Sequence, residues 1–151
     1  MRHKFFKRLA AAAVLLLGAA SASAHDFEVD GIYYKKNGDG TSVSVTYEGV
    51  NEIASDRVLY TGAVIIPSEV TCGGTTYSVT KIGSYAFYDC DGLTSVEIPN
   101  SVTEIGYSAF KYCSGLTSVV IPNSVTKIGI NVFDKCSGLT SVEIPNSVTS
   151  I

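Results

Sequence analysis

The sequence is dominated by a repeat with a period of 23 residues. Residues 93–115 read LTSVEIPNSVTEIGYSAFKYCSG, residues 116–138 read LTSVVIPNSVTKIGINVFDKCSG, and a third copy begins at Leu139. The first two copies are identical at 16 of 23 positions, and the seven differences leave the framework of apolar residues intact. A fixed period of this length is typical of solenoids, in which each copy adds one turn to a stack.

Apolar residues within each copy mark the side chains expected to point inward. Leu93, Val96 and Ile98 have the spacing of a strand, which Pro99 ends because proline has no N–H to give to a sheet. The same positions recur at Leu116, Val119, Ile121 and at Leu139, Val142, Ile144. Stacked turns place equivalent residues about 4.7–4.9 Å apart, so each inward position should form a column. Two predicted columns are Phe87, Phe110, Phe133 and Ile82, Ile105, Ile128, Ile151.

The return segment after each strand contributes further apolar residues, including Ala109 and Phe110. Its stretch from Gly106 to Cys113 is too short for an independent helix, so we expect one or two helical turns held by Phe110. The predicted fold is therefore a repeat solenoid with one parallel sheet and short helical or irregular return segments.

Residues 1–24 are typical of a signal peptide. Four basic residues precede an apolar run of twelve residues: Arg2, Lys4, Lys7 and Arg8, then Leu9–Ala20. Small residues at Ala22 and Ala24 suit signal peptidase, and a membrane-spanning helix needs about 20 apolar residues. We expect cleavage after Ala24, export, and no membrane insertion of the product.

Charge argues against nucleic acid as a partner. Cleavage of the signal peptide would remove four of the eleven basic residues and none of the fourteen acidic ones. The mature chain would then have a net charge of −7. Binding to phosphates requires a basic face, and the remaining sequence supplies none. It also lacks the basic amphipathic stretch of a membrane-surface helix.

Residues 25–66 do not carry the repeat. They contain FEVDGIYYKK, TSVSVTYEG and RVLYTGAVIIP, whose alternation of apolar and polar residues predicts antiparallel strands. The sequence Asn-Gly-Asp-Gly at 37–40 predicts a hairpin turn. A calcium loop is excluded there because Lys35 and Thr46 occupy positions that require carboxylates. We expect an N-terminal β cap over 25–66 and the repeat array over 67–151.

The first repeat, residues 65–83, is interrupted by a predicted hairpin with Cys72 and two glycines near its tip. Together with the antiparallel strands, this hairpin would cover the end of the array, which otherwise has an apolar face without a neighbour.

The pattern LTSVxIPNSVTxIGxxAFxxCxG resembles the BspA-like leucine-rich repeats of secreted and surface proteins of bacteria and some protozoa. The resemblance extends from about Ile65 to the end of the chain, with Val132 in place of the usual Ala. It implies a leucine-rich repeat fold, and it implies adhesion to host matrix proteins or to other microbes. The third repeat stops at Ile151 before its Ala-Phe and Cys positions, so we expect the chain to be a fragment of a longer protein.

The cysteines admit three interpretations. Cys90, Cys113 and Cys136 recur every 23 residues, and Cys72 lies in the hairpin. A column cannot converge on zinc, and side chains one strand apart hold their Cβ atoms wider than the roughly 3.5–4.5 Å of a disulfide. Exported proteins do carry disulfides, but the pattern favours buried thiols that act as small apolar groups.

Catalytic motifs are absent from the sequence. His25 is the single histidine left after processing, no phosphate-binding glycine loop or nucleophile motif is present, and the residues predict no enzyme, cofactor or metal site. The leading hypothesis is a secreted or cell-surface scaffold that binds extracellular proteins through the outward strand positions. These are Thr94, Ser95, Glu97, Thr117, Ser118, Val120, Thr140, Ser141 and Glu143.

Two other functions stay open at this stage. One is a structural spacer that displays a missing C-terminal domain. The other is a glycan-binding surface protein, for which Tyr107 and Tyr112 on the return side could provide aromatic platforms.

Overall fold

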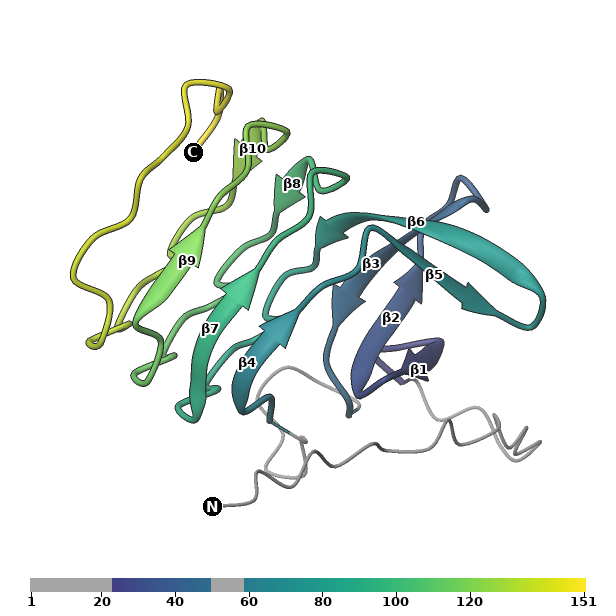
Figure 1. The fold of residues 1–151 in the computed structure, drawn as a ribbon, viewed down its shortest axis with the longest axis horizontal. Helices are drawn as coiled ribbons and strands as arrows, with labels where there is room; N and C mark the ends of the chain where they lie inside the picture. Colours follow the sequence, from purple (N-terminus) through teal and green to yellow (C-terminus); the bar gives the residue numbers. More distant parts are fainter. Residues whose placement is uncertain (1–22, 50–58) are drawn as a thin grey trace, which may run out of the picture.

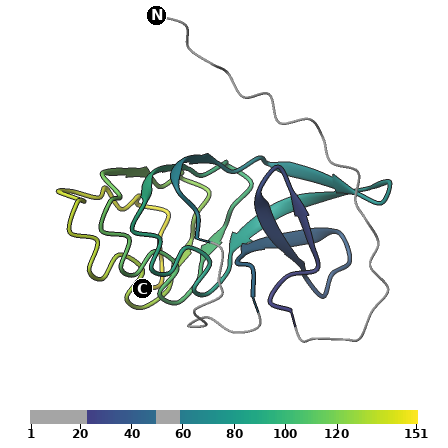
Figure 2. The same cartoon turned by 90° about the horizontal axis from the view of Figure 1, so that it is seen from below.

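A computed structural model describes residues 23–49 and 59–151, and within those ranges it contains ten strands and no helix. The turns of the chain are stacked side by side, with antiparallel strands at one end of the stack and the C-terminus at the other (Figures 1 and 2). The predicted signal peptide, residues 1–24, lies outside the described residues except for Ser23 and Ala24.

Three antiparallel strands open the described chain, as the alternating sequence predicts. They are β1 (Phe27–Val29), β2 (Ile32–Lys36) and β3 (Ser42–Thr46). Asp39 organises the turn between β2 and β3, where its carboxylate accepts the Ser42 hydroxyl at 2.6 Å and the N–H groups of Thr41 and Ser42 at 2.8 Å. Together these hydrogen bonds lower the pKa of Asp39 to about 2, and the bond from the Ser42 hydroxyl has the largest effect.

The cap continues directly into a parallel ladder of the array. β3 pairs in parallel with β6 (Thr75–Ile82), which is followed by β8 (Glu104–Ile105) and β10 (Lys127–Ile128), all parallel. β5 (Glu69–Cys72) pairs antiparallel with the first half of β6. The predicted hairpin is thus confirmed, and its tip uses Gly73 and Gly74 at φ 58° and 80°, values that glycine adopts without strain.

A second parallel ladder forms a separate sheet of β4 (Gly62–Ile65), β7 (Leu93–Glu97) and β9 (Ser118–Val120). Two predictions are corrected here. The array has two parallel ladders instead of one, because the return segment itself forms β8 and β10. Residues 62–65 are parallel to β7 instead of antiparallel within the cap, because their register aligns them with the strand one turn later.

The predicted helical turns are wrong within the described residues. Ser108 and Tyr112 have φ of 50° and 66°, in the left-handed region that ends a right-handed helix. The N–H groups of Ser108, Phe110 and Tyr112 donate to the next turn of the chain at 2.9–3.0 Å, where an α-helix would use them internally. The acceptors are the carbonyl oxygens of Ile130, Val132 and Asp134. The return segment is therefore a series of tight turns, joined to the next return segment by a ladder of backbone hydrogen bonds.

The inward columns form the core. Phe87 and Phe110 are fully buried and their rings stack at 4.9 Å, Phe133 continues the stack at 5.6 Å from Phe110, and Tyr60 contacts Phe87 at 4.7 Å. The isoleucine column is confirmed for its first three members, which pair across β6, β8 and β10.

The last turn of the chain departs from the predicted columns. Ile151 is 78% exposed, and the residue before it, Ser150, forms an isolated bridge with Lys127 instead of a strand. Ile144, also predicted to point inward, is 41% exposed.

Candidate functional site

The outward side chains of the three-stranded sheet lie in rows that cross the strands. Strand register defines two rows, Ala63–Ser95–Ser118 and Ile65–Glu97–Val120. Paired strands are about 4.8 Å apart, and their hydrogen bonds fix that spacing. We call this surface the sheet face, and define it as these two rows together with Ser141 and Glu143 one turn later.

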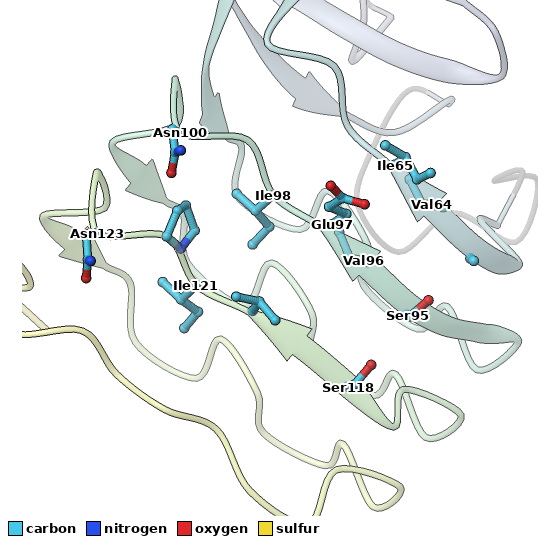
Figure 3. A pocket seen from close by; sticks show the side chains of 13 residues that line it. Val64, Ile65, Ser95, Val96, Glu97, Ile98, Asn100, Ser118, Ile121 and Asn123 are labelled. Carbon is cyan, nitrogen blue, oxygen red and sulfur yellow. The ribbon is translucent and has the colours of Figure 1, made fainter.

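The sheet face is hollowed (Figure 3). A hollow of about 720 Å³ covers β4, β7 and β9, and a second adjoins it over the following turn of chain. The predicted residues that line the two hollows are Ser95, Glu97, Thr117, Ser118, Val120, Ser141 and Glu143. The structure therefore brings most of the predicted positions to one surface.

Thr94 and Thr140 are exposed but line neither hollow. The register between β4 and β7 shifts here, so Gly62 pairs with Leu93 and Ala63 with Ser95, and Thr94 is left without a partner position on β4. The Thr94 carbonyl instead accepts the N–H of Thr117 at 3.0 Å and its hydroxyl at 3.1 Å.

The sequence prediction missed Ile65, Asn100 and Asn123, which also line the first hollow. A signal for each was present. Ile-Ile-Pro at 65–67 aligns with Glu-Ile-Pro at 97–99, and an asparagine follows the proline in the three later copies, at Asn100, Asn123 and Asn146. Figure 3 shows Glu97 beside Ile65, and Asn100 and Asn123 in a row at the edge of the hollow.

Apolar surface is exposed beside the carboxylates of the sheet face. Ile65 is 67% and Val120 74% exposed, and both lie in register with Glu97 between them. Exposed apolar side chains on adjacent strands are the kind of surface that proteins use to bind a partner. Side chains held by a sheet also lose little entropy on contact.

Other chemistries have little support in the described residues. No group of three or more His, Cys, Asp or Glu in residues 23–49 and 59–151 is placed to hold a metal ion. Glu97 and Glu143 are separated by the turn that carries Val120. His25 contacts the Ser23 hydroxyl at 3.0 Å and the Tyr33 ring, and lines neither of the two hollows.

Four tyrosines gather on the return side, and we call them the tyrosine cluster: Tyr85, Tyr88, Tyr107 and Tyr112. Their rings meet edge to face, Tyr85 with Tyr88 and Tyr107, and Tyr88 with Tyr112, at 5.3–5.6 Å. Tyr107 is 42% and Tyr112 39% exposed, as a binding platform requires. Lys111 lies 5.1 Å over the Tyr112 ring and bonds Asp134 at 2.9 Å, which lowers the pKa of that carboxyl group.

The cysteine column is buried, as the spacing predicts. Cys90, Cys113 and Cys136 are thiols with at most 8% exposure, while Cys72 is half-buried in the hairpin. The Cys113 thiol donates to the Phe87 carbonyl at 2.9 Å, and Cys136 donates to that of Phe110 at 3.0 Å. Interaction with the Cys136 side chain and burial raise the pKa of Cys113.

Thiol alkylation should separate the two kinds of cysteine. We expect the native protein to take up one label, at Cys72, because the other three thiols are buried and out of reach of the reagent. Intact mass after alkylation, with and without denaturant, measures this, and Cys72→Ser should abolish the native label. Rapid labelling of Cys113 in the folded protein would contradict the buried column.

The described chain thus has the features of a binding scaffold: stacked strands, a packed tube of apolar columns and one exposed sheet face. Residues 74–151 match the BspA type leucine-rich repeat region, with six copies. The chain belongs to this family, as the sequence resemblance indicated. Proteins of this repeat class are in general binding scaffolds and not enzymes.

Solved bacterial structures are similar to this chain. A leucine-rich repeat protein from Bacteroides ovatus is 34% identical over 84% of this chain and 32% of its own, with a TM-score of 0.72. A leucine rich cell surface protein from Faecalibacterium prausnitzii is 36% identical over 87% of this chain and 34% of its own, with a TM-score of 0.67. A leucine-rich repeat protein from Bacteroides capillosus is 31% identical over 86% of this chain and 88% of its own, with a TM-score of 0.68.

The chain spans about a third of the length of the first two of these proteins. No curated protein matches it. Within the part of the chain that the structure describes, no helix is long and apolar enough to cross a membrane.

Proposed function

We propose that this chain is a protein-interaction module of a secreted or cell-surface bacterial protein, which binds extracellular proteins through the sheet face in the manner of an adhesin. The observation that carries the proposal is the pair of outward rows, Ala63–Ser95–Ser118 and Ile65–Glu97–Val120, set in register over a hollow. Strand pairing preorganises these side chains, and preorganisation lowers the entropic cost of binding.

Affinity for one turn of the array should be low. The sheet face consists of Ser, Glu and aliphatic residues, and the described residues that line its two hollows include no Trp, Tyr or Arg, the residue types that dominate binding energy at most interfaces. Binding would therefore come from several turns acting together. The number of turns in contact, more than any single residue, would set the affinity.

The export that the sequence predicts would fit this function. The N-terminal sequence is typical of a signal peptide, and a similar structure from Faecalibacterium prausnitzii is that of a leucine rich cell surface protein. A location outside the cytoplasm would give the sheet face access to extracellular partners.

A second candidate function is glycan binding by the tyrosine cluster. The exposed rings of Tyr107 and Tyr112 favour it, because pyranose rings stack on aromatic faces. The edge-to-face contacts within the cluster occupy part of this aromatic surface, so we rank glycan binding below protein binding.

A pair of substitutions on the sheet face tests the leading proposal. Ile65→Thr with Val120→Thr removes exposed apolar surface while keeping β-branched residues that suit strands. We expect binding to immobilised host extracellular-matrix proteins, measured by surface plasmon resonance, to weaken by about tenfold or more. The midpoint of thermal unfolding should stay nearly unchanged, because both side chains are already exposed.

The matched control is Tyr107→Ser with Tyr112→Ser, which removes two exposed residues from the return side. This pair should leave matrix-protein binding within about twofold of the unmodified protein. If the tyrosine pair abolished binding and the sheet-face pair did not, the recognition surface would be the tyrosine cluster and the sheet-face proposal would be wrong.

A further inference from the structure

Three adjoining hollows form one groove along this side of the molecule. The hollow over β4, β7 and β9 shares Ser118, Val120 and Asn123 with the hollow over the last turn. At its other end it shares Ala63 and Ile65 with a third hollow, lined by residues of the cap. We call the three together the sheet groove; it extends the sheet face from the last turn onto the antiparallel cap.

Apolar side chains are exposed along the whole sheet groove. The large apolar residues that line it are Leu59, Ile65, Val120 and Ile144, with exposed fractions of 37, 67, 74 and 41%. Ile144 lies on the last turn of the described chain, and its equivalents Ile98 and Ile121 are only 6 and 7% exposed. The exposed apolar surface that characterises the sheet groove is therefore that of Leu59, Ile65 and Val120. Such a concentration on one side of a molecule marks an interaction surface.

The charged side chains of the sheet groove all have one sign. Glu97 and Glu143 lie on the array, and Glu28 and Asp30 line the hollow at the cap. No lysine, arginine or histidine is among the described residues that line the three hollows.

Lysines occur on other surfaces of the described chain. Lys81 and Lys111 form ion pairs with Glu104 and Asp134 at 3.2 and 2.9 Å. Lys35 and Lys36 line a separate hollow with Lys81. The acidic groups of the sheet groove therefore have no basic residue among the described residues of its lining, whereas Glu104 and Asp134 on other surfaces are paired with lysines.

We propose that the occupant of the sheet groove is a basic polypeptide segment that carries Lys or Arg together with apolar side chains. This inference rests on the proposed function, and it adds the chemistry of the partner. A Lys or Arg side chain would lay its aliphatic stem over Ile65 or Val120 and place its charged end at Glu97 or Glu143. The carboxylates of Glu97 and Glu143, which form no ion pair with the described residues, would then be paired by the partner.

The spacing of the carboxylates defines a suitable segment. Glu97 and Glu143 lie on turns two apart, which corresponds to about 9–10 Å across stacked strands. A polyproline II segment advances about 9 Å in three residues and returns to the same face. A basic residue at every third position would therefore meet successive carboxylates.

Synthetic peptides of repeated Lys-Pro-Val and Glu-Pro-Val triplets provide the probe, because proline favours the polyproline II conformation. Fluorescence anisotropy of labelled peptides would measure binding to the full chain. We expect the lysine peptide to bind and the glutamate peptide not to bind, and the affinity of the lysine peptide should fall as salt is raised. Equal binding of the two peptides, or binding of neither, would overturn the assignment of a basic partner.

Neutralising substitutions distinguish specific binding in the sheet groove from non-specific attraction of a cationic peptide to an acidic protein. Glu97→Gln with Glu143→Gln should lower the affinity for the lysine peptide by about five- to tenfold. Glu69→Gln with Asp89→Asn changes the net charge equally at exposed residues that line none of the three hollows, and should change affinity by less than about twofold. Equal losses from both pairs would mean non-specific attraction and would refute the proposal.

The cap end of the sheet groove has its own test. Glu28→Gln with Asp30→Asn removes both charges at the cap. The glutamine introduced by the first change keeps an amide oxygen that can accept the hydrogen bond from the Gly31 N–H, which the Glu28 carboxylate accepts at 2.7 Å. We expect a further loss of affinity for a peptide long enough to reach the cap, and unchanged affinity would exclude the cap from the binding surface. Failure of all peptide experiments, with matrix-protein binding still sensitive to Ile65→Thr and Val120→Thr, would refute the basic partner and leave the proposed function standing.

Discussion

Phe110→Ala should lower the free energy of unfolding by about 3–5 kcal/mol. Phe110 is fully buried, and its ring is stacked between Phe87 at 4.9 Å and Phe133 at 5.6 Å. The surrounding backbone is held by hydrogen bonds to the next turn, including that from the Phe110 N–H to the Val132 carbonyl at 3.0 Å. The cavity left by the ring therefore cannot collapse easily, which is the condition for a large loss.

Phe133→Ala is the matched control in the same column. Its side chain is half-buried and lies one turn nearer the end of the array, so its removal should cost clearly less than that of Phe110. Urea unfolding followed by circular dichroism measures both variants. A loss below about 1 kcal/mol for Phe110→Ala, or a larger loss for Phe133→Ala, would be incompatible with a continuous aromatic core.

The aromatic column was predictable because the repeat converts a one-dimensional period into a spatial one. Residues 23 positions apart must occupy equivalent places in successive turns, so Phe87, Phe110 and Phe133 had to align. The burial of Cys90 and Cys113 followed from the same argument. No long-range contact had to be guessed, since each turn packs on its sequence neighbours.

The conformation of the return segment was not predictable by the same means. Its residues, such as Ala109 and Phe110, are compatible with a helical turn, and local propensity gives no reason to place Ser108 and Tyr112 at positive φ. What decides the conformation is the hydrogen bonding between turns, because N–H groups that face the next copy cannot also close a helix. That is a property of the stack and not of the segment.

The residues of the candidate site could be predicted where they belong to regular copies of the repeat. They could not be predicted in the N-terminal part, where the repeat is interrupted or absent. Ser95, Ser118 and Ser141 followed from the period. Ile65 falls where the predicted cap and the interrupted first repeat overlap, and only the parallel register of β4 with β7 places it beside Glu97. Glu28 and Asp30 line the sheet groove because the cap packs against the array, and no local sequence pattern encodes that packing.

Gly106 and Gly129, which directly follow β8 and β10, hold the turns at their close spacing. A Cβ added at Gly106 would lie 2.5 Å from the Ser84 nitrogen and 2.8 Å from the Gly83 carbonyl carbon, and Gly129 has the same environment one turn later. These atoms belong to the backbone of the preceding turn, so they cannot move aside as a side chain would. The Gly106 N–H also donates to the Ile82 carbonyl at 2.8 Å, which fixes the distance between the two turns.

Gly106→Ala should therefore destabilise the protein by about 3 kcal/mol or more, at or above the upper end of the usual cost of overpacking. Gly38→Ala is the control, because nothing lies within 4 Å of a Cβ at that position and its φ is not in the left-handed region. Reduced freedom of the unfolded chain should make this control neutral or slightly stabilising. The two glycine-to-alanine changes are thus expected to differ in size and in sign when urea midpoints are compared. Equal effects would show that the turns are not in the close backbone contact on which both parallel ladders depend.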